Sequence, residues 1–246
     1  MTIRKIKLKI SYDGTAYHGW AAQPGMATIH GTVCDAIEKL TGIRVELRGS
    51  SRTDAGVHAL GQVAAFSIES PVPTENFLRA LNHLLPEDIA ILDAMEVPET
   101  FDPIGDTQSK IYRYTLNTEP VRPVMDIRYC WHRPGRLDVN AMAVAARRLL
   151  GKHDFKSFAS AADTRESSVR TVLRCDVKSD EPWIYIDVQA DGFLYNMVRN
   201  IVGTLVEVGR GRWSPEDVDC ILKAKDRNVA GPIAPASGLC LMEIFY

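Results

Sequence analysis

Segments in which apolar and polar residues alternate one by one are the feature that most constrains the fold of this chain. In residues 5–12, for example, Ile6, Leu8 and Ile10 alternate with lysines. A period of two places the apolar side chains on one face of a β-strand, and that face must be buried against a core. Further strands are predicted at residues 43–48, 63–66, 89–97, 110–117, 170–178, 183–190 and 239–246.

Segments with helical periodicity and their own start and stop signals separate several of these strands. Thr28 is placed to cap a helix that ends at Gly42, and Thr74 to cap a helix that reaches Pro86. Asp138 is placed to cap a third helix over residues 139–150. Two more helices are predicted over residues 193–208 and 215–224, and Ser-Pro-Glu-Asp forms the start of the second.

The order of these elements predicts an α+β protein in two halves. Residues 98–109 are rich in proline, aspartate and threonine and have little apolar periodicity, which is typical of a boundary. The halves are predicted at residues 1–104 and 105–246, each with a sheet covered by helices on one face. A chain of 246 residues with 46% hydrophobic residues can bury a substantial core in this way.

Composition and missing motifs exclude several classes of protein. The chain contains no run of 18 apolar residues, and its first residues alternate charged with apolar side chains, so we expect a cytoplasmic protein without a membrane partner. Its five cysteines lie far apart and form no Cys-x-x-Cys pair, which predicts reduced thiols and neither a disulfide framework nor a zinc site. The sequence also lacks a Walker loop and a His-Glu-x-x-His motif.

Arginine accounts for 19 of the 29 basic residues, although the net charge of the chain is −2. A broad basic field is therefore absent, but the arginine side chain suits bidentate contacts with phosphate. Clusters of basic residues at 128–136, 147–156, 165–174 and 210–212 predict positive walls beside an RNA-binding cleft.

A polar loop over residues 50–61 lies between the predicted strands at 43–48 and 63–66. It holds Arg52, Asp54 and His58 among hydroxyl-bearing residues and glycines. Strands on both sides can aim Asp54 rigidly, and the glycines let a bulky ligand approach the backbone. The alternative interpretation is a turn with a purely structural role, which is common for short segments of this composition.

The run Arg-Thr-Asp-Ala-Gly-Val-His-Ala at residues 52–59 resembles the signature of the TruA family of pseudouridine synthases. Other segments resemble the same family in the same order, so the resemblance covers nearly the whole chain. One departure is Ser51, where the family usually has glycine, but no charged group is missing. The other matching segments lie at residues 12–23, 110–114, 153–158, 192–200 and 236–241.

The resemblance implies a fold and a reaction. The implied fold consists of two ferredoxin-like (RRM-like) halves with a joined, mainly antiparallel sheet, helices on one face and an active-site cleft between the halves. The implied protein is a homodimer that converts uridines at positions 38, 39 and 40 of the tRNA anticodon stem-loop to pseudouridine after base flipping. Moving C1′ of the ribose from N1 to C5 of the uracil needs no redox agent or energy donor, so no cofactor and no metal are expected.

The resemblance also implies roles for individual residues. Asp54 matches the catalytic aspartate, and Arg199 matches the cation that keeps this carboxylate ionised. Tyr112 would stack on the uracil and assist removal of the C5 proton, while Arg52 would occupy the space left by the flipped uridine. Leu239 would form part of the pocket wall.

Two alternatives stay open from the sequence. The same chemistry could act on another RNA, or the chain could be a non-catalytic RNA-binding module of the same fold. The presence of Asp54 weighs against a module that only binds RNA, because a carboxylate repels an anionic ligand. The sequence also leaves open whether Asp54 attacks C6 of the base, attacks C1′ of the ribose or deprotonates the sugar.

Overall fold

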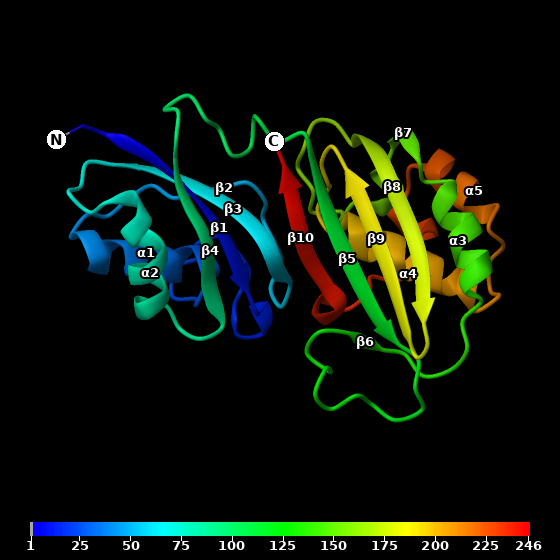
Figure 1. The fold of residues 1–246 in the computed structure, drawn as a ribbon. Helices are drawn as coiled ribbons and strands as arrows, with labels where there is room; N and C mark the ends of the chain where they lie inside the picture. Colours follow the sequence, from blue (N-terminus) through cyan, green and yellow to red (C-terminus); the bar gives the residue numbers. More distant parts are fainter. Residues whose placement is uncertain (1) are drawn as a thin grey trace. The chain divides into compact units, whose positions relative to one another are not determined.

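The computed structural model describes residues 2–246, which form two compact units (Figure 1). The first unit contains the chain up to Gln108 together with Leu241–Tyr246, and the second contains Ser109–Cys240. The division into residues 1–104 and 105–246 as separate halves stays a prediction. Within residues 2–246 no helix is long and apolar enough to cross a lipid bilayer.

An antiparallel sheet with β1 between two neighbours forms the first unit. Strand β1 (Arg4–Tyr12) pairs with β3 (His58–Ile68) on one side and with β4 (Ile89–Val97) on the other. The short strand β2 (Arg48–Gly49) pairs with β3, and β10 (Leu239–Phe245) follows β3 in the strand order. The apolar residues of β1 lie on the buried face of the strand, as predicted, because Ile6, Leu8 and Ile10 are fully buried.

Two helices complete this unit. The helix α1 (Ile29–Thr41) begins where the Thr28 hydroxyl accepts a hydrogen bond from the Gly31 N–H, and it ends at Gly42 in a left-handed conformation with φ of 75°. The helix α2 (Thr74–Leu84) follows Pro73, so Thr74 is its first residue instead of its cap. Helix α2 packs against α1 and β4.

The second unit also contains an antiparallel sheet, in the order β5 (Ser109–Asn117), β9 (Trp183–Ala190), β8 (Val169–Asp180) and β7 (Gly151–Asp154). The two-residue strand β6 (Trp131–His132) pairs with β5 in parallel. The predicted α+β class with mainly antiparallel strands is therefore confirmed. Single-turn 3₁₀ helices lie at Gly14–Ala16, Lys156–Phe158, Arg227–Val229 and Ala236–Gly238.

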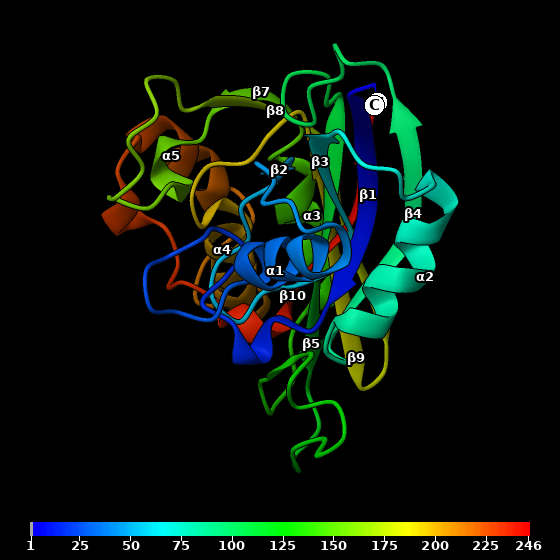
Figure 2. The ribbon, with the colours of Figure 1, turned by 90° about the vertical axis from the view of Figure 1, so that its left-hand side faces the viewer.

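Three helices cover this sheet. The helices α3 (Val139–Arg147) and α4 (Met197–Gly209) pack against each other and lie over one face of the sheet, as Figures 1 and 2 show, and α5 (Asp217–Ala224) packs near β7. The Asp138 carboxylate caps α3 by accepting a hydrogen bond from the Ala141 N–H at 2.9 Å, as predicted. Arg199 is the one residue of α4 that is not buried.

The predicted strand at residues 43–48 is wrong for most of its length. Its alternation is real, because Val45 and Leu47 are buried while the residues between them are exposed. However, α1 takes the place of a partner strand: Arg44 pairs with Asp35 at 2.5 Å, and the His30 ring donates a hydrogen bond to the Leu47 carbonyl at 2.9 Å. Burial can therefore alternate along an extended segment that joins no sheet.

The predicted start of α4 at residue 193 is also wrong. The helix begins at Met197, and Asn196 before it has a left-handed conformation with φ of 62°. Residues 193–196 form a turn in which the Met197 N–H donates to the Leu194 carbonyl. The apolar residues of this turn continue the periodicity of α4, so the pattern overstates the length of the helix.

Candidate active site

The loop that carries Asp54 connects β2 to β3 and is fixed by its neighbours on both sides. Before Arg52, the Gln62 amide donates a hydrogen bond to the Ser51 carbonyl at 2.7 Å. After Arg52, the buried Thr53 hydroxyl forms a hydrogen bond with the Tyr12 hydroxyl at 2.7 Å. The loop is therefore anchored to β1 and β3 close to Asp54.

A second segment, residues 13–20, packs directly against the backbone of this loop. Gly19 has φ of 86°, and a Cβ atom built on it would lie 2.6 Å from the Thr53 carbonyl oxygen and 3.0 Å from the carbonyl carbon of Asp54. A Cβ atom on Gly14 would lie 2.0 Å from the carbonyl oxygen of Val57. Only glycine allows these backbone contacts, which hold the loop on both sides of Asp54.

The side chains of the loop differ in what they contact. The Asp54 side chain is half-buried, and His58 is buried with its Nδ1 atom 3.1 Å from the Gly14 nitrogen. This contact gives His58 a structural role in holding the neighbouring turn. The Arg52 side chain is exposed, and within residues 2–246 its guanidinium forms no hydrogen bond or ion pair. Arg52 can therefore reach a ligand without first breaking an interaction.

Tyr112 lies in the second unit, on β5, and is held by an aromatic contact. Its side chain is buried, and its ring meets the Phe193 ring edge to face with 5.1 Å between the ring centroids. The Phe193 carbonyl in turn accepts a hydrogen bond from Arg165. The sequence did not assign a role to Phe193, although it lies in the matching segment at residues 192–200.

Arg199 donates hydrogen bonds to two neutral groups of the second unit. Its Nε donates to the Ala234 carbonyl at 2.7 Å, and its Nη1 donates to the Asn196 side-chain oxygen at 3.1 Å. The left-handed conformation of Asn196 returns its amide toward the first turn of α4. Asn196 is thus a positioning residue for Arg199 that the sequence did not reveal.

Leu239 follows a segment that is fastened to both β5 and α4. Leu239 is buried at the start of β10, and the Tyr114 hydroxyl donates to the Pro235 carbonyl at 2.8 Å. Burial raises the pKa of Tyr114, and the nearby Arg199 cation opposes this rise. Gly238 packs on the Tyr114 ring, because a Cβ atom there would lie 2.6 Å from the ring. Tyr114 therefore fastens the segment before Leu239 to β5.

The five predicted site residues divide between the two units. Arg52 and Asp54 share one loop of the first unit. Tyr112, Arg199 and Leu239 belong to the second unit, where residues 192–199 and 234–239 position them.

Lys110 is an additional charged residue near Tyr112. It lies two residues before Tyr112 on β5, so both side chains are on the same face of the strand. Burial lowers the pKa of Lys110 to about 8, and the positive charge of Arg165 contributes to this decrease. The same Arg165 also lowers the pKa of Arg170, after the larger effect of burial. Three cations therefore lie close together beside the Tyr112–Phe193 pair.

Comparison with known proteins gives a consistent result over the whole chain. A family described as tRNA pseudouridine synthase matches residues 9–104 and 145–246. The chain is 47% identical over 243 residues to tRNA pseudouridine synthase A of Moorella thermoacetica, covering 98% of this chain and 99% of that protein. It is 45% identical over 244 residues to tRNA pseudouridine synthase A of Pelobacter propionicus, covering 99% and 100%. It is 46% identical over 244 residues to tRNA pseudouridine synthase A 2 of Clostridium perfringens, with the same coverage.

We expect the burial of Lys110 to make stability depend on pH in a defined window. The pKa of Lys110 is about 8 in the folded chain and 10.5 without perturbation, so between these values the unfolded chain binds more protons and stability rises with pH. Lys110→Met should raise the free energy of unfolding by roughly 1–3 kcal/mol at pH 7. This gain should shrink from pH 8 to pH 10.5.

Urea denaturation of both proteins at several pH values between 7 and 10 measures this difference. Lys178→Met is the matched control, because Lys178 is exposed on β8 of the same unit. A gain in stability that does not change with pH would contradict the interpretation.

Proposed function

This chain belongs to the tRNA pseudouridine synthase family, and we propose that it modifies uridines 38, 39 and 40 of the tRNA anticodon stem-loop with Asp54 as its catalytic carboxylate. The chain is an isomerase that acts on uridine in tRNA. The reaction breaks the bond between C1′ and N1, turns the uracil and joins C1′ to C5. A proton leaves C5 and another is bound at N1, so atoms and electrons balance within one nucleotide.

The observation that carries the role of Asp54 is the rigidity of its loop. Asp54 is half-buried on a segment fixed by Gln62, Tyr12 and the close backbone contact of Gly19. A carboxylate held in this way reaches a bound nucleotide without the entropic cost of ordering a flexible loop. Attack on C6, attack on C1′ and deprotonation of the ribose each need an ionised carboxylate in a fixed position.

We propose that three other side chains act on the same uridine. Arg199 supplies the positive charge that favours ionised Asp54, and its contacts with Ala234 and Asn196 fix its direction before substrate binds. The Tyr112 ring stacks on the uracil, and its hydroxyl assists removal of the C5 proton. Leu239 adds an apolar wall.

Arg52 is proposed to stabilise the flipped state of the target uridine. A base in a helical stem must leave the stack before it reacts, which costs a few kcal/mol. The exposed Arg52 guanidinium can enter the space that the uridine leaves, since it has no partner within residues 2–246 to give up. Its positive charge also suits the surrounding phosphates.

We further propose that the protein is a cytoplasmic homodimer, because tRNA is in the cytoplasm and extends far beyond the anticodon stem-loop. One chain of 27.3 kDa offers little surface for the remaining tRNA, and a second copy supplies it. The connection between β5 and β6 exposes apolar side chains that a second copy could cover. Val121, Val124 and Met125 are 73%, 70% and 86% exposed.

We expect Asp54→Asn to abolish pseudouridine formation while tRNA affinity stays within about tenfold, or 1.4 kcal/mol. Asparagine keeps the shape of the side chain but removes the charge and the nucleophile. Release of tritium from C5-labelled uridine in tRNA measures turnover, and filter binding measures affinity. Asp93→Asn, at an exposed position on β4, is the control and should keep full activity. Turnover above a few per cent of wild type in the Asp54→Asn variant would exclude Asp54 as the catalytic carboxylate.

Tyr112→Phe should keep the aromatic contact with Phe193 and lose only the hydroxyl. We therefore expect tRNA binding to be retained and release of the C5 proton to slow at least tenfold in single-turnover experiments. Tyr185→Phe on β9 removes a hydroxyl from the same sheet and serves as the control. Equal single-turnover rates for wild type and Tyr112→Phe would show that the hydroxyl has no catalytic role.

Light scattering should give a particle of about twice the chain mass. Met125→Asp places a charge among the exposed apolar residues of the β5–β6 connection and should shift the particle toward the monomer. Val144→Asp, at a partly exposed position on α3, should leave the particle mass unchanged. A wild-type monomer would contradict the dimer, and a dimeric Met125→Asp variant would contradict the proposed interface.

A further inference from the structure

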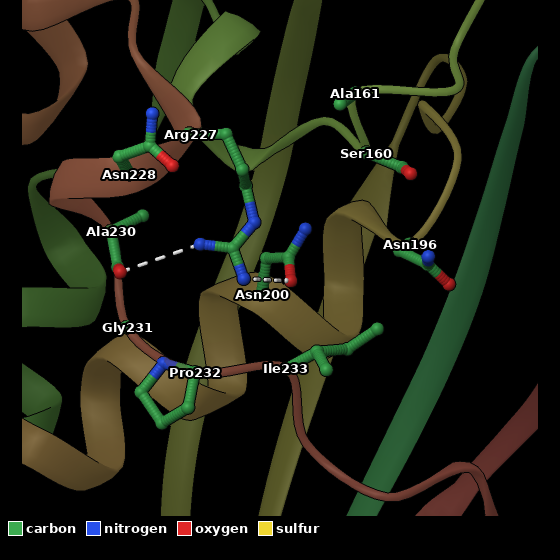
Figure 3. A pocket seen from close by; sticks show the side chains of 10 residues that line it. All are labelled: Ser160, Ala161, Asn196, Asn200, Arg227, Asn228, Ala230, Gly231, Pro232 and Ile233. Atoms are coloured by element: carbon green, nitrogen blue, oxygen red, sulfur yellow. Dashed lines mark hydrogen bonds between the residues drawn. The ribbon is translucent and has the colours of Figure 1, made fainter.

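An open hollow of about 440 Å³ lies in the second unit beside the start of α4. We call it the α4 hollow; it is formed by residues from three separate segments, at 160–161, 196–200 and 227–233. Figure 3 shows the Arg227 side chain pointing toward Asn200, with Pro232 and Ile233 along one side and Ser160 and Ala161 on another. Pockets of roughly 300–1,000 Å³ are of the size that holds small organic ligands.

Arg227 brings an uncompensated positive charge to the α4 hollow. Its Nη2 donates to the Asn200 side-chain oxygen at 2.9 Å and its Nη1 donates to the Ala230 carbonyl at 3.3 Å, and both acceptors are neutral (Figure 3). Within residues 2–246 it forms no ion pair, and burial lowers its pKa. The neighbouring Asp226 carboxylate is occupied by the backbone and side-chain amides of Asn228.

The guanidinium is held in a fixed direction and still has donors to offer. Asn200 is buried, and its amide nitrogen donates to the Phe158 carbonyl at 2.8 Å, which turns its oxygen toward Arg227. A guanidinium carries five N–H donors, so about three remain for a ligand after these two bonds. A preorganised cation with free donors is suited to the oxygens of a phosphate.

The floor of the hollow is also rigid. The Gly231 N–H donates to the Thr204 hydroxyl at 2.9 Å, and a Cβ atom on Gly203 would lie 1.7 Å from the Pro232 carbonyl oxygen. Residues 230–232 therefore pack directly on the backbone of α4. Pro232 and Ile233 are exposed and form an apolar wall, against which a ribose or a base can rest.

The α4 hollow shares a wall with Arg199. Asn196 lines the hollow and accepts a hydrogen bond from Arg199, while Arg199 also donates to Ala234, the residue after Ile233. A ligand in the hollow therefore lies next to the residue proposed to act at the target uridine. In RNA the chemical group next to a target nucleotide is another nucleotide, with its own phosphate, ribose and base.

We propose that the α4 hollow binds a nucleotide that neighbours the target uridine, with its phosphate on Arg227 and its ribose or base against Pro232 and Ile233. That the bound nucleotide neighbours the target uridine rests on the proposed role of Arg199. That the hollow binds RNA does not depend on this role. The hollow then contributes to substrate affinity, and chemistry at the uridine does not depend on Arg227.

Two variants test the hollow independently. Arg227→Gln removes the charge and keeps an amide that can still bond with Asn200. Ala161→Glu adds a carboxylate at an exposed position of the hollow and removes no hydrogen-bonding side chain. Ala161→Gln controls for size, and Ala224→Glu controls for charge at an exposed position of α5.

We expect Arg227→Gln to weaken tRNA binding about tenfold at low salt and to reduce the slope of log affinity against log salt by about 0.7–0.9, the value for one phosphate contact. Ala161→Glu should weaken binding at least fivefold relative to Ala161→Gln, and Ala224→Glu should bind like wild type. Single-turnover rates at saturating tRNA should stay within threefold of wild type in all four variants.

An unchanged salt slope in Arg227→Gln, together with equal affinity of the Ala161→Glu and Ala161→Gln variants, would overturn the proposal. A loss of the saturating rate with intact affinity would also overturn it, because Arg227 would then act in chemistry. If Arg227→Gln lowers the melting temperature, its loss of affinity can come from a destabilised fold. The comparison of Ala161→Glu with Ala161→Gln then decides whether the hollow binds tRNA. Affinity and salt slope are measured without turnover, so this outcome is distinct from a failure of Asp54→Asn to abolish activity.

Discussion

The position of Asp54 depends on a backbone contact that only glycine permits. Gly19 and Gly14 bring residues 13–20 so close to the Asp54 loop that a single methyl group would overlap its carbonyls. The hydrogen bonds of Tyr12 and Gln62 act on the same loop from the sheet. The loop loses its backbone entropy during folding, which suits the role proposed for the Asp54 carboxylate, because the backbone that carries it is already fixed.

In the second unit, close backbone packing at glycines also fixes the segments that orient charged side chains. Residues 230–239 carry carbonyls that orient Arg199 and Arg227, and they contact α4 and β5 through Gly231 and Gly238 without room for a Cβ atom. Arg199 is half-buried, and all other residues of helix α4 are buried. Neutral carbonyl and amide oxygens take part in holding both guanidiniums, which fixes their direction, and Arg227 forms no ion pair within residues 2–246.

The local charge of this unit differs from the charge of the chain. The net charge of the chain is −2. In this unit, however, the positive charge of Arg165 adds to the effect of burial and lowers the pKa of both Lys110 and Arg170. Asp163 lies 3.5 Å from Arg165, and Asp191 and Asp163 oppose the decrease in the pKa of Arg170, so carboxylates of the chain offset part of this positive charge. The remaining positive charge near Tyr112 and at Arg227 agrees with the proposed contacts with RNA, a polyanion.

The sequence by itself determined the strands and helices whose patterns are local. The alternation in residues 5–12, the Thr28 and Asp138 caps and the strands at residues 89–97 and 183–190 are all present in the structure, because periodicity and capping depend on neighbours in the chain. The matching segments also identified the family. They named Asp54, Tyr112 and Arg199 as site residues, and those roles stay predictions.

Only the tertiary structure decided which distant segments each local element packs against and bonds with. Residues 43–48 alternate like a strand, but Arg44 and Leu47 bond with α1, and no local signal encodes that choice. Helix α4 begins later than its apolar pattern predicts, because Asn196 before it has a left-handed conformation and its side-chain oxygen bonds with Arg199. The α4 hollow combines residues up to 73 positions apart, from Ser160 to Ile233. Such contacts are set by the packing of distant segments, which sequence periodicity does not record.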